Sequence, residues 1–150
     1  MMNSNVEILP MTKDSAKNAA ELEKLCFSAP WSYEMLCKEG LCEQGEFLCA
    51  FVNGEFAGYA GMICVLDEGQ ICNVAVCPLF RRMGVGEALM EAQKKAALSR
   101  GLAVMMLEVR ASNIAAQKLY EKTGWEKVGV RKNYYSFPRE DGVLYNLYLS

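Results

Sequence analysis

The chain has 150 residues, the usual length of one domain, and we expect residues 1–150 to form a single domain. Its net charge is −2 and it has no run of lysine or arginine, which argues against direct nucleic-acid binding. Hydrophobic residues make up 52% of the chain, but no apolar stretch approaches the roughly 20 residues of a membrane span. The first residues lack the basic start and the apolar run of a signal peptide. We therefore expect a cytoplasmic protein with no membrane partner.

The first half of the chain predicts two helices. Met11–Phe27 carries apolar residues at spacings of three and four, with Asp14 or Ser15 as the expected N-cap. Pro30 breaks the chain, and Ser32 is expected to cap a second, shorter helix. A helical pair therefore precedes the first predicted strand.

The middle of the chain predicts three strands. Phe47–Val52 and Glu55–Leu66 flank Asn53-Gly54, a strong two-residue hairpin signal, and Gln70–Val76 is expected to follow as the third strand.

The second half alternates between helices and strands. The expected elements are a helix at Glu87–Arg100, a strand at Ala103–Arg110, a helix at Ala111–Thr123, and strands at Trp125–Ser136 and Val143–Leu149 joined by a Pro138–Gly142 loop. The whole order predicts an α/β fold, with a mixed and largely antiparallel sheet and one parallel crossover.

The amino-acid composition restricts the possible chemistry, because the chain contains no histidine. Ser-His-Asp catalysis, Cys-His catalysis and the commonest zinc sites are excluded, so a general base has to be Glu, Asp, Lys, Tyr or Cys. The seven cysteines are odd in number and form no C-x-x-C pair; they are Cys26, Cys37, Cys42, Cys49, Cys64, Cys72 and Cys77. We expect buried, reduced thiols in place of disulfides or metal ligands.

A phosphate-binding junction is indicated between the third strand and the helix that follows it. Gly84 and Gly86 remove side chains where backbone amides must approach a ligand, and the helix N-terminus adds free N–H groups with a partial positive charge. Arg81 and Arg82 add full charges, which suits a pyrophosphate. The segment is neither a Walker loop nor a Rossmann fingerprint. A plain turn that uses glycines for its geometry is the alternative.

This junction resembles the [R/Q]-x-x-G-x-[G/A] signature of the GNAT acetyltransferase superfamily through Arg81, Gly84 and Gly86. Further segments resemble the bacterial RimI family, so that the similarity covers nearly the whole chain; they are Ala29–Ser32, Leu107–Asn113, Leu119–Trp125 and Arg131–Tyr135. The resemblance implies the GNAT fold, with six to seven strands and about four helices, and acetyl-CoA as cosubstrate without a metal. One departure is Cys77, where relatives often carry Asp.

The resemblance also implies which residues bind the coenzyme. They are Val74, Ala75, Val76, Arg81, Arg82, Met83, Gly84, Val85, Gly86, Glu87, Asn113 and Tyr120. An amide-containing pantetheine arm can pair with the strand at Val74–Val76 as a peptide pairs with a sheet edge, and the Val76 N–H could polarise the thioester carbonyl. For Asn113, a role as a helix cap alone is the alternative.

Two residues are the catalytic candidates. Glu108 is a carboxylate in an otherwise apolar strand, and the resemblance makes it the general base; the alternative is a structural pair with Arg110 on the same strand face. Tyr120 lies two helical turns after Asn113, and the resemblance makes it the general acid that protonates the departing thiolate; the alternative is a packed helix tyrosine. We expect direct acetyl transfer.

The resemblance to the RimI family implies that the substrate is the N-terminal alanine of a small-subunit ribosomal protein. An α-amine has a pKa of about 7.7–8.0, whereas a lysine amine at about 10.4 needs some 3 kcal/mol more for deprotonation, which favours the α-amine. By analogy with the family, Trp31, Tyr33, Tyr134 and Tyr135 border the peptide groove, although both C-terminal tyrosines could instead pack against the sheet. Other N-termini, lysine side chains or small amines are alternative substrates, and a non-catalytic acyl-CoA-binding module is a further alternative. We expect a monomer or weak dimer.

Overall fold

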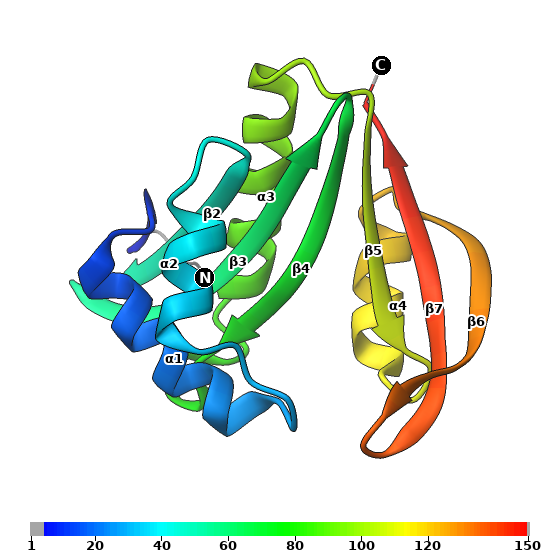
Figure 1. Cartoon of the computed structure of the whole chain (residues 1–150), viewed down its shortest axis with the longest axis horizontal. Helices are drawn as coiled ribbons and strands as arrows, with labels where there is room; N and C mark the ends of the chain where they lie inside the picture. The colour runs from blue at the N-terminus through cyan, green and yellow to red at the C-terminus, as the bar shows by residue number, and fades with distance from the viewer. Residues whose placement is uncertain (1–4, 150) are drawn as a thin grey trace.

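The computed structural model describes residues 5–149, which form one seven-stranded sheet in the order β1-β2-β3-β4-β5-β7-β6 (Figure 1). The elements are β1 (Val6–Pro10), α1 (Lys13–Cys26), α2 (Tyr33–Gly40), β2 (Gly45–Val52), β3 (Glu55–Val65), β4 (Glu68–Val76), the 3₁₀ turn η1 (Pro78–Phe80), α3 (Val85–Ser99), β5 (Val104–Arg110), α4 (Ile114–Lys122), β6 (Glu126–Ser136) and β7 (Arg139–Tyr148). Among the strand pairs of residues 5–149, only β4–β5 is parallel. The predicted mixed, mostly antiparallel sheet with about four helices is confirmed.

Strand β1 was not predicted from the sequence. Its five residues pair with β2, from Val6 opposite Val52 to Pro10 opposite Leu48, and they form one edge of the sheet. The strand is short and ends in Pro10. Proline has no N–H to donate to a neighbouring strand, so within sheets it is found mainly in edge strands. Neither a clear alternation nor a preceding turn marks such a segment in the sequence.

Several predicted boundaries differ from the observed ones by one to three residues, and two predictions at the ends of elements were wrong for identifiable reasons. The N-cap of α1 is Thr12 and not Asp14 or Ser15, because Thr12 Oγ1 accepts from the Ser15 N–H and Ser15 Oγ accepts from the Thr12 N–H in a reciprocal capping box. The expected loop at 138–142 is mostly strand, because β7 already begins at Arg139, which pairs with Ser136.

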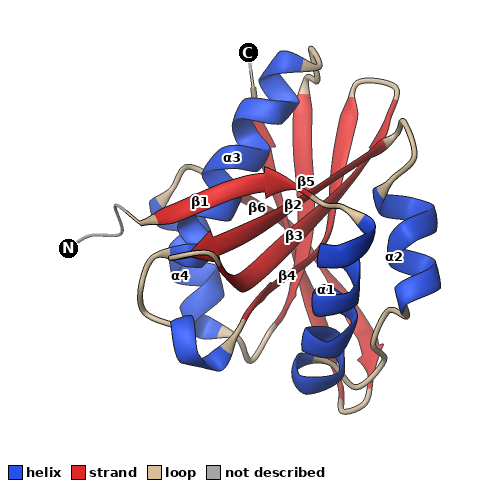
Figure 2. Cartoon of the chain, turned by 90° about the vertical axis from the view of Figure 1, so that its left-hand side faces the viewer, coloured by secondary structure: helices blue, strands red, loops and turns tan. Residues whose placement is uncertain are grey.

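The helices cover both faces of the sheet, with α1 and α2 on one side and α3 and α4 on the other (Figure 2). Strand β2 shows why both faces need a cover, since its successive side chains point alternately into two separate hydrophobic cores. Phe47 and Cys49 pack with the buried residues of α1 and α2, whereas Leu48 and Ala50 pack with Leu89 of α3. None of the helices within residues 5–149 is long and apolar enough to cross a bilayer.

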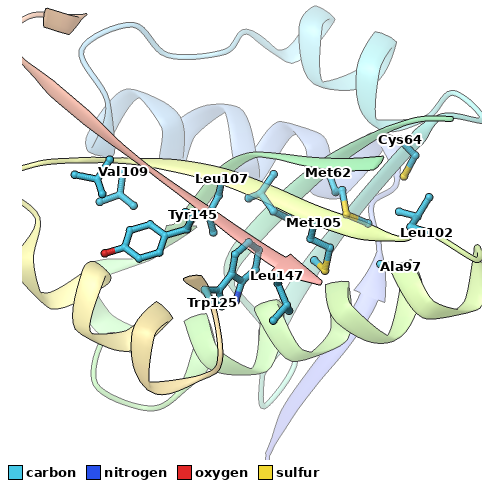
Figure 3. Close-up of a cluster of buried hydrophobic side chains, with 12 residues drawn as sticks. Met62, Cys64, Ala97, Leu102, Met105, Leu107, Val109, Trp125, Tyr145 and Leu147 are labelled. Carbon is cyan, nitrogen blue, oxygen red and sulfur yellow. The ribbon is translucent and has the colours of Figure 1, made fainter. Parts of the chain in front are cut away.

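A third core lies under the C-terminal half of the sheet (Figure 3). Met105 of β5 and Tyr145 of β7 are fully buried there beside Trp125, which closes the turn between α4 and β6. The partly buried Tyr120 of α4 packs against this cluster. The core therefore fixes α4 relative to β5.

The two halves of the sheet are joined over only a short stretch. Strands β4 and β5 pair where Glu68–Gln70 lies beside Val104–Met106, and beyond this stretch they separate (Figure 1). A β-bulge at Cys72 accompanies the separation, since Ile71 pairs with Met62 but Asn73 pairs with Gly61. Residues 71–76 of β4 thus have a strand partner on one side only.

The cysteines are all free thiols, as expected, but only two of them are buried. Cys49 and Cys64 are in the interior, four others are partly exposed, and Cys42 is exposed in the turn after α2. The expectation of burial was therefore wrong for five of the seven, because apolar neighbours in the sequence do not show which side chains other elements will cover.

Thiol reactivity should follow this difference in burial. Burial raises the pKa of the Cys49 thiol to about 11, so the reactive thiolate is scarce at pH 8. We expect iodoacetamide at pH 8 to modify Cys42 first and to leave Cys49 unmodified until the protein is unfolded, as measured by peptide mass spectrometry. Equal labelling rates at the two positions would contradict this assignment.

Candidate active site

A cleft of about 1040 Å³ opens where β4 and β5 separate. Its walls come from β4, β5, the α1–α2 connection, α4 and the turn between β6 and β7. The predicted site residues that line it are Trp31, Val74, Glu108, Asn113, Tyr120, Tyr134 and Tyr135. The fold thus brings both catalytic candidates into one cavity from segments far apart in the sequence.

The other predicted site residues lie elsewhere. Tyr33 is on α2 and packs beside the α1 core, and the structure does not place it in the cleft lining. Ala75, Val76 and the segment Arg81–Gly86 lie at the far end of β4 and the start of α3, outside the lining. Glu87 lines a second, smaller groove between α3 and α4, and Tyr120 forms part of both walls.

Glu108 projects from the face of β5 that also carries Met106 and Arg110, while Met105, Leu107 and Val109 point into the core. The alternative pairing with Arg110 is wrong, because the nearest cation to Glu108 is Arg131, with 3.6 Å between Nε and Oε2. Oε2 is buried and accepts no hydrogen bond from a described residue. A Cβ at Gly142 would lie 3.3 Å from this oxygen. The carboxylate is therefore held in a tight space, where Oε2 faces the Arg131 guanidinium but accepts no hydrogen bond.

Tyr120 is fixed by its ring and free at its hydroxyl. The ring centroid lies 5.8 Å from that of Trp125 and 6.0 Å from that of Tyr145, and the hydroxyl forms no hydrogen bond with a described residue. Burial raises the pKa of Tyr120, which keeps the phenol protonated near neutral pH. On the same helix, Asn113 Oδ1 accepts from the Ala116 N–H at 3.1 Å, so the capping role of Asn113 is present.

The junction between η1 and α3 has the geometry of an anion site. Arg82 and Gly84 both have left-handed backbones, with φ of 66° and 76°, and the first backbone bond of the helix runs from the Ala88 N–H to Gly84 O. The amides before Ala88 therefore lack helical acceptors. A Cβ at Gly86 would meet only Val76 Cγ2 at 3.8 Å, so the protein itself leaves space at this position.

The two arginines of this junction differ in their contacts. Arg81 donates through Nε to Val76 O at 3.2 Å and through Nη2 to Cys26 Sγ at 3.7 Å, which ties it to the end of β4. Arg82 is exposed and forms no ion pair within residues 5–149. Arg82 is therefore the more available charge for a phosphate.

Comparison with known proteins agrees with this geometry. The model of the acetyltransferase (GNAT) family matches residues 16–125. The chain belongs to the GNAT acetyltransferase family. The ribosomal protein bS18-alanine N-acetyltransferases of Escherichia coli and Haemophilus influenzae are 38% and 36% identical to it, over 88% and 86% of this chain and 90% and 89% of theirs. The crystal structure of the Escherichia coli enzyme superposes with a TM-score of 0.89 at 34% identity, covering 97% of this chain and 94% of that one.

This GNAT protein is thus an acetyl-CoA-dependent N-acetyltransferase of the RimI group. Its own residues fit the coenzyme, since a pyrophosphate needs free amides and space and a pantetheine arm needs an unpaired strand edge. Both features are present, at the start of α3 and along residues 71–76. Among residues 5–149 no group of three Cys, Asp or Glu side chains is arranged to hold a metal ion.

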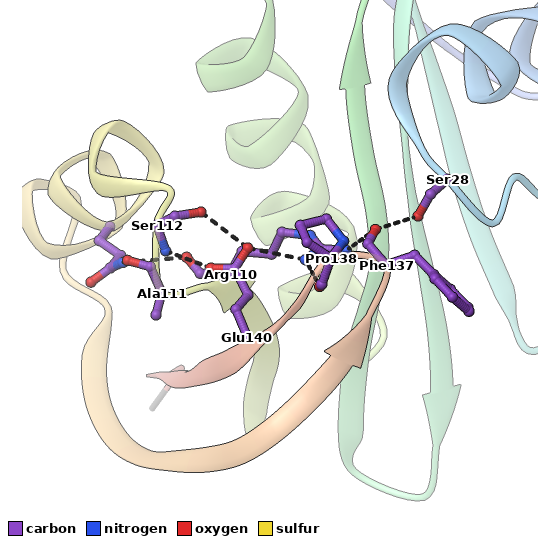
Figure 4. A network of polar contacts seen from close by, with 8 residues as sticks. Ser28, Arg110, Ala111, Ser112, Phe137, Pro138 and Glu140 are labelled. Carbon is purple, nitrogen blue, oxygen red and sulfur yellow. Dashed lines mark hydrogen bonds and ion pairs between the residues drawn. The ribbon is translucent and has the colours of Figure 1, made fainter.

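A polar network holds the cleft wall of this GNAT enzyme that carries Tyr134 and Tyr135 (Figure 4). Arg110 donates to Pro138 O at 2.8 Å, to Phe137 O at 3.1 Å and to Glu140 Oε2 at 3.0 Å. Glu140 also accepts from the N–H and hydroxyl of Ser112, just before α4. Ser28 Oγ donates to Phe137 O at 2.8 Å from across the cleft. The β6–β7 turn is thereby tied to β5 and the start of α4 on one side of the cleft and to the α1–α2 connection on the other.

Acid should release this network in a defined pH range. The Ser112 N–H, together with the Arg110 guanidinium, holds the pKa of Glu140 below that of an ordinary glutamate, about 4.3. Because the pKa of Glu140 is lower in the folded than in the unfolded state, ionised Glu140 stabilises the folded protein above the unfolded-state pKa. This stabilisation is lost as the pH falls through the folded-state pKa. We expect Glu140→Gln to lower the melting temperature at pH 7, with a difference from wild type that shrinks below about pH 4.

The control for this measurement is Glu55→Gln, because Glu55 is exposed and forms no ion pair within the described chain. It should leave the pH dependence unchanged. A difference for Glu140→Gln that stays constant between pH 7 and pH 3 would show that ionisation of Glu140 does not hold the turn.

Two polar residues at or behind the cleft were not predicted from the sequence. Asn73 interrupts the apolar run of β4 and lines the cleft, which is the same kind of signal that identified Glu108. Glu23 lies on the apolar face of α1, at helical spacing from Ala16, Ala19 and Ala20, and it is fully buried. An acidic residue on the buried face of a helix is the signal that could have found it.

Proposed function

We propose that this enzyme acetylates the N-terminal alanine of a small-subunit ribosomal protein. The observation that carries the proposal is the meeting of Glu108 and Tyr120 in one cleft, beside the unpaired part of β4. Support for the substrate comes from relatives at 36–38% identity that are named for the alanine of ribosomal protein bS18.

In the proposed mechanism, acetyl-CoA supplies an acetyl group activated as a thioester. Glu108 takes a proton from the substrate amine as the amine nitrogen attacks the thioester carbonyl carbon and the C–N bond forms. The backbone N–H of Val76, two residues beyond the cleft-lining Val74 on the unpaired part of β4, is proposed to stabilise the negative charge that develops on the carbonyl oxygen. Tyr120 donates its phenolic proton to the departing sulfur as the carbon–sulfur bond breaks. The protonated state of Tyr120 that burial favours is the one this role requires.

The coenzyme-binding residues divide between two regions. Val74–Val76 is proposed to pair with the pantetheine arm, and Arg81–Glu87 to hold the pyrophosphate, with Arg82 as the main charge. Asn113 and Tyr120 are proposed to contact the coenzyme from α4, across the cleft from β4.

The peptide is proposed to enter beside Trp31, Tyr134 and Tyr135, which line the cleft. Tyr33 is not included, because it lies outside the lining. An α-amine needs about 3 kcal/mol less for deprotonation than a lysine amine, and a single carboxylate base suits the smaller requirement.

The test is release of coenzyme A from acetyl-CoA with a peptide that begins Ala-Arg-Tyr. A second peptide with a blocked N-terminus and an internal lysine competes in the same assay. We expect the product mass to show one acetyl group on the α-amine of the first peptide and none on the second. Preferred acetylation of the lysine peptide would indicate a different GNAT activity, and coenzyme binding without turnover on any amine would indicate a binding module.

A further inference from the structure

A buried carboxylate that the proposed mechanism does not use lies behind the cleft. Glu23, in the last turns of α1, has 0% of its surface exposed, and it pairs with no lysine or arginine within residues 5–149. Burying an ionised carboxylate without a cation is costly unless hydrogen bonds satisfy it. The neighbours of Glu23 therefore have to supply donors.

Three donors surround the Glu23 carboxylate. The Trp31 N–H donates to Oε1 at 2.9 Å, and Asn73 Nδ2 donates to Oε2 at 2.9 Å. The Tyr59 hydroxyl donates to the same Oε2. Burial, with the neighbouring Glu23 charge, raises the pKa of Tyr59, so its hydroxyl remains a donor. Two of these donors, Trp31 and Asn73, belong to residues that line the cleft, while Tyr59 is inside the core.

The chemistry of the carboxylate fixes the orientation of the Asn73 side chain. An ionised carboxylate only accepts hydrogen bonds, so Asn73 has to turn its NH₂ group toward Glu23 and its carbonyl oxygen away. That oxygen, Oδ1, accepts no hydrogen bond from a described residue. Asn73 directly follows the bulge at Cys72, on the part of β4 that has lost its pairing with β5. Asn73 therefore offers the cleft its carbonyl oxygen, a hydrogen-bond acceptor, and keeps its NH₂ donor group turned toward Glu23.

We infer that Asn73 is a substrate-binding residue whose carboxamide oxygen, oriented by Glu23, accepts a hydrogen bond from a nitrogen of the substrate's first residue. Glu23 acts through Asn73 and is a positioning residue. The Glu23 carboxylate also accepts a hydrogen bond from the Trp31 N–H, so one side chain positions both Asn73 and Trp31 in the cleft wall. The inference rests on the proposed function, because the nitrogen donor is the amine terminus of the peptide substrate.

The first test is Asn73→Leu, which removes the amide with little change in volume. We expect KM for the Ala-Arg-Tyr peptide to rise by about 10-fold, the effect of one lost hydrogen bond to a charged donor, while KM for acetyl-CoA changes less than twofold. The matched control is Asn18→Leu, since Asn18 is exposed on α1, lies outside the cleft lining and forms no side-chain hydrogen bond with a described residue. It should leave both KM values unchanged.

The second test separates orientation by Glu23 from general support. Gln at position 23 both donates and accepts, so Glu23→Gln frees Asn73 to turn over, and the peptide KM should rise as in Asn73→Leu. The double variant should be no worse than Asn73→Leu alone, because both changes remove one interaction. Tyr59→Phe removes a donor to Glu23 outside the cleft; it should lower the melting temperature and leave the peptide KM unchanged.

The outcomes separate this inference from the proposed function. Wild-type turnover with an unchanged peptide KM in Asn73→Leu would refute the role of Asn73 and leave the function standing. Additive effects in the double variant, or a rise in peptide KM for Tyr59→Phe equal to that of Asn73→Leu, would show that Glu23 gives only structural support. If Glu23→Gln does not fold, the Tyr59→Phe comparison decides this point. No acetylation of any amine by the wild type would overturn the function and the inference together.

Discussion

Glu108→Gln is expected to lower kcat for the Ala-Arg-Tyr peptide by about 10²- to 10⁴-fold, the usual contribution of a general base. The amide is nearly the same size but cannot take a proton from the amine. The contacts of Glu108 with its surroundings are few, since Arg131 at 3.6 Å is its nearest cation and Oε2 accepts no hydrogen bond within the described chain. Steady-state kinetics with both substrates varied measures the effect.

The control for this prediction is Glu126→Gln. Glu126 is exposed at the start of β6 and forms no ion pair with a described residue. Coenzyme binding should be unchanged in both variants, because Glu108 is on β5 and the proposed pyrophosphate site is at the start of α3. Turnover by Glu108→Gln at the wild-type rate would remove Glu108 from the proposed mechanism.

Tyr120→Phe is expected to lower kcat by about 10²-fold or more, because the leaving thiolate loses its proton donor. The substitution should leave the melting temperature nearly unchanged. The ring keeps its packing against Trp125 and Tyr145, and the missing hydroxyl leaves no partner unsatisfied among the described residues. The variant therefore separates chemistry from folding.

Tyr148→Phe is the matched control, since Tyr148 lies on β7 outside the cleft lining and Asn146 Nδ2 is the one described donor to its hydroxyl. A fall in kcat for Tyr120→Phe with no fall for Tyr148→Phe supports the assignment. If the rate with a peptide amine is unchanged in Tyr120→Phe, water or the substrate itself supplies the proton, and Tyr120 is only a packing residue.

The order of helices and strands could be predicted because its signals are local. Asn53-Gly54 marks a hairpin, and Ser32 caps α2 through a hydrogen bond to the Met35 N–H. The strand β1 could not be predicted, since its place is fixed by pairing with a strand about 40 residues later. The opening between β4 and β5 is likewise a property of two distant segments, and no pattern within either one encodes it.

The candidate site shows the same limit. Glu108 could be found because a carboxylate in an apolar strand is unusual within its own segment. Its partner could not, because Arg131 reaches it from β6 while the closer residue in sequence, Arg110, is bound to the turn at Phe137 and Pro138. Tyr33 shows that closeness in sequence is not enough. It follows the cleft-lining Trp31 by two residues, but its side chain packs with the core under α1.

The short β4–β5 junction also bears on how the protein unfolds. The two halves of the sheet share only three paired positions on each strand, so a coenzyme lying between them would replace the missing part of the ladder. Ligand that binds only the folded state raises stability by RT ln(1 + [L]/Kd), about 2.7 kcal/mol at 100 times Kd. Acetyl-CoA would then stabilise the contact between the two halves of the sheet, and its concentration would set the melting temperature of the enzyme as well as its rate.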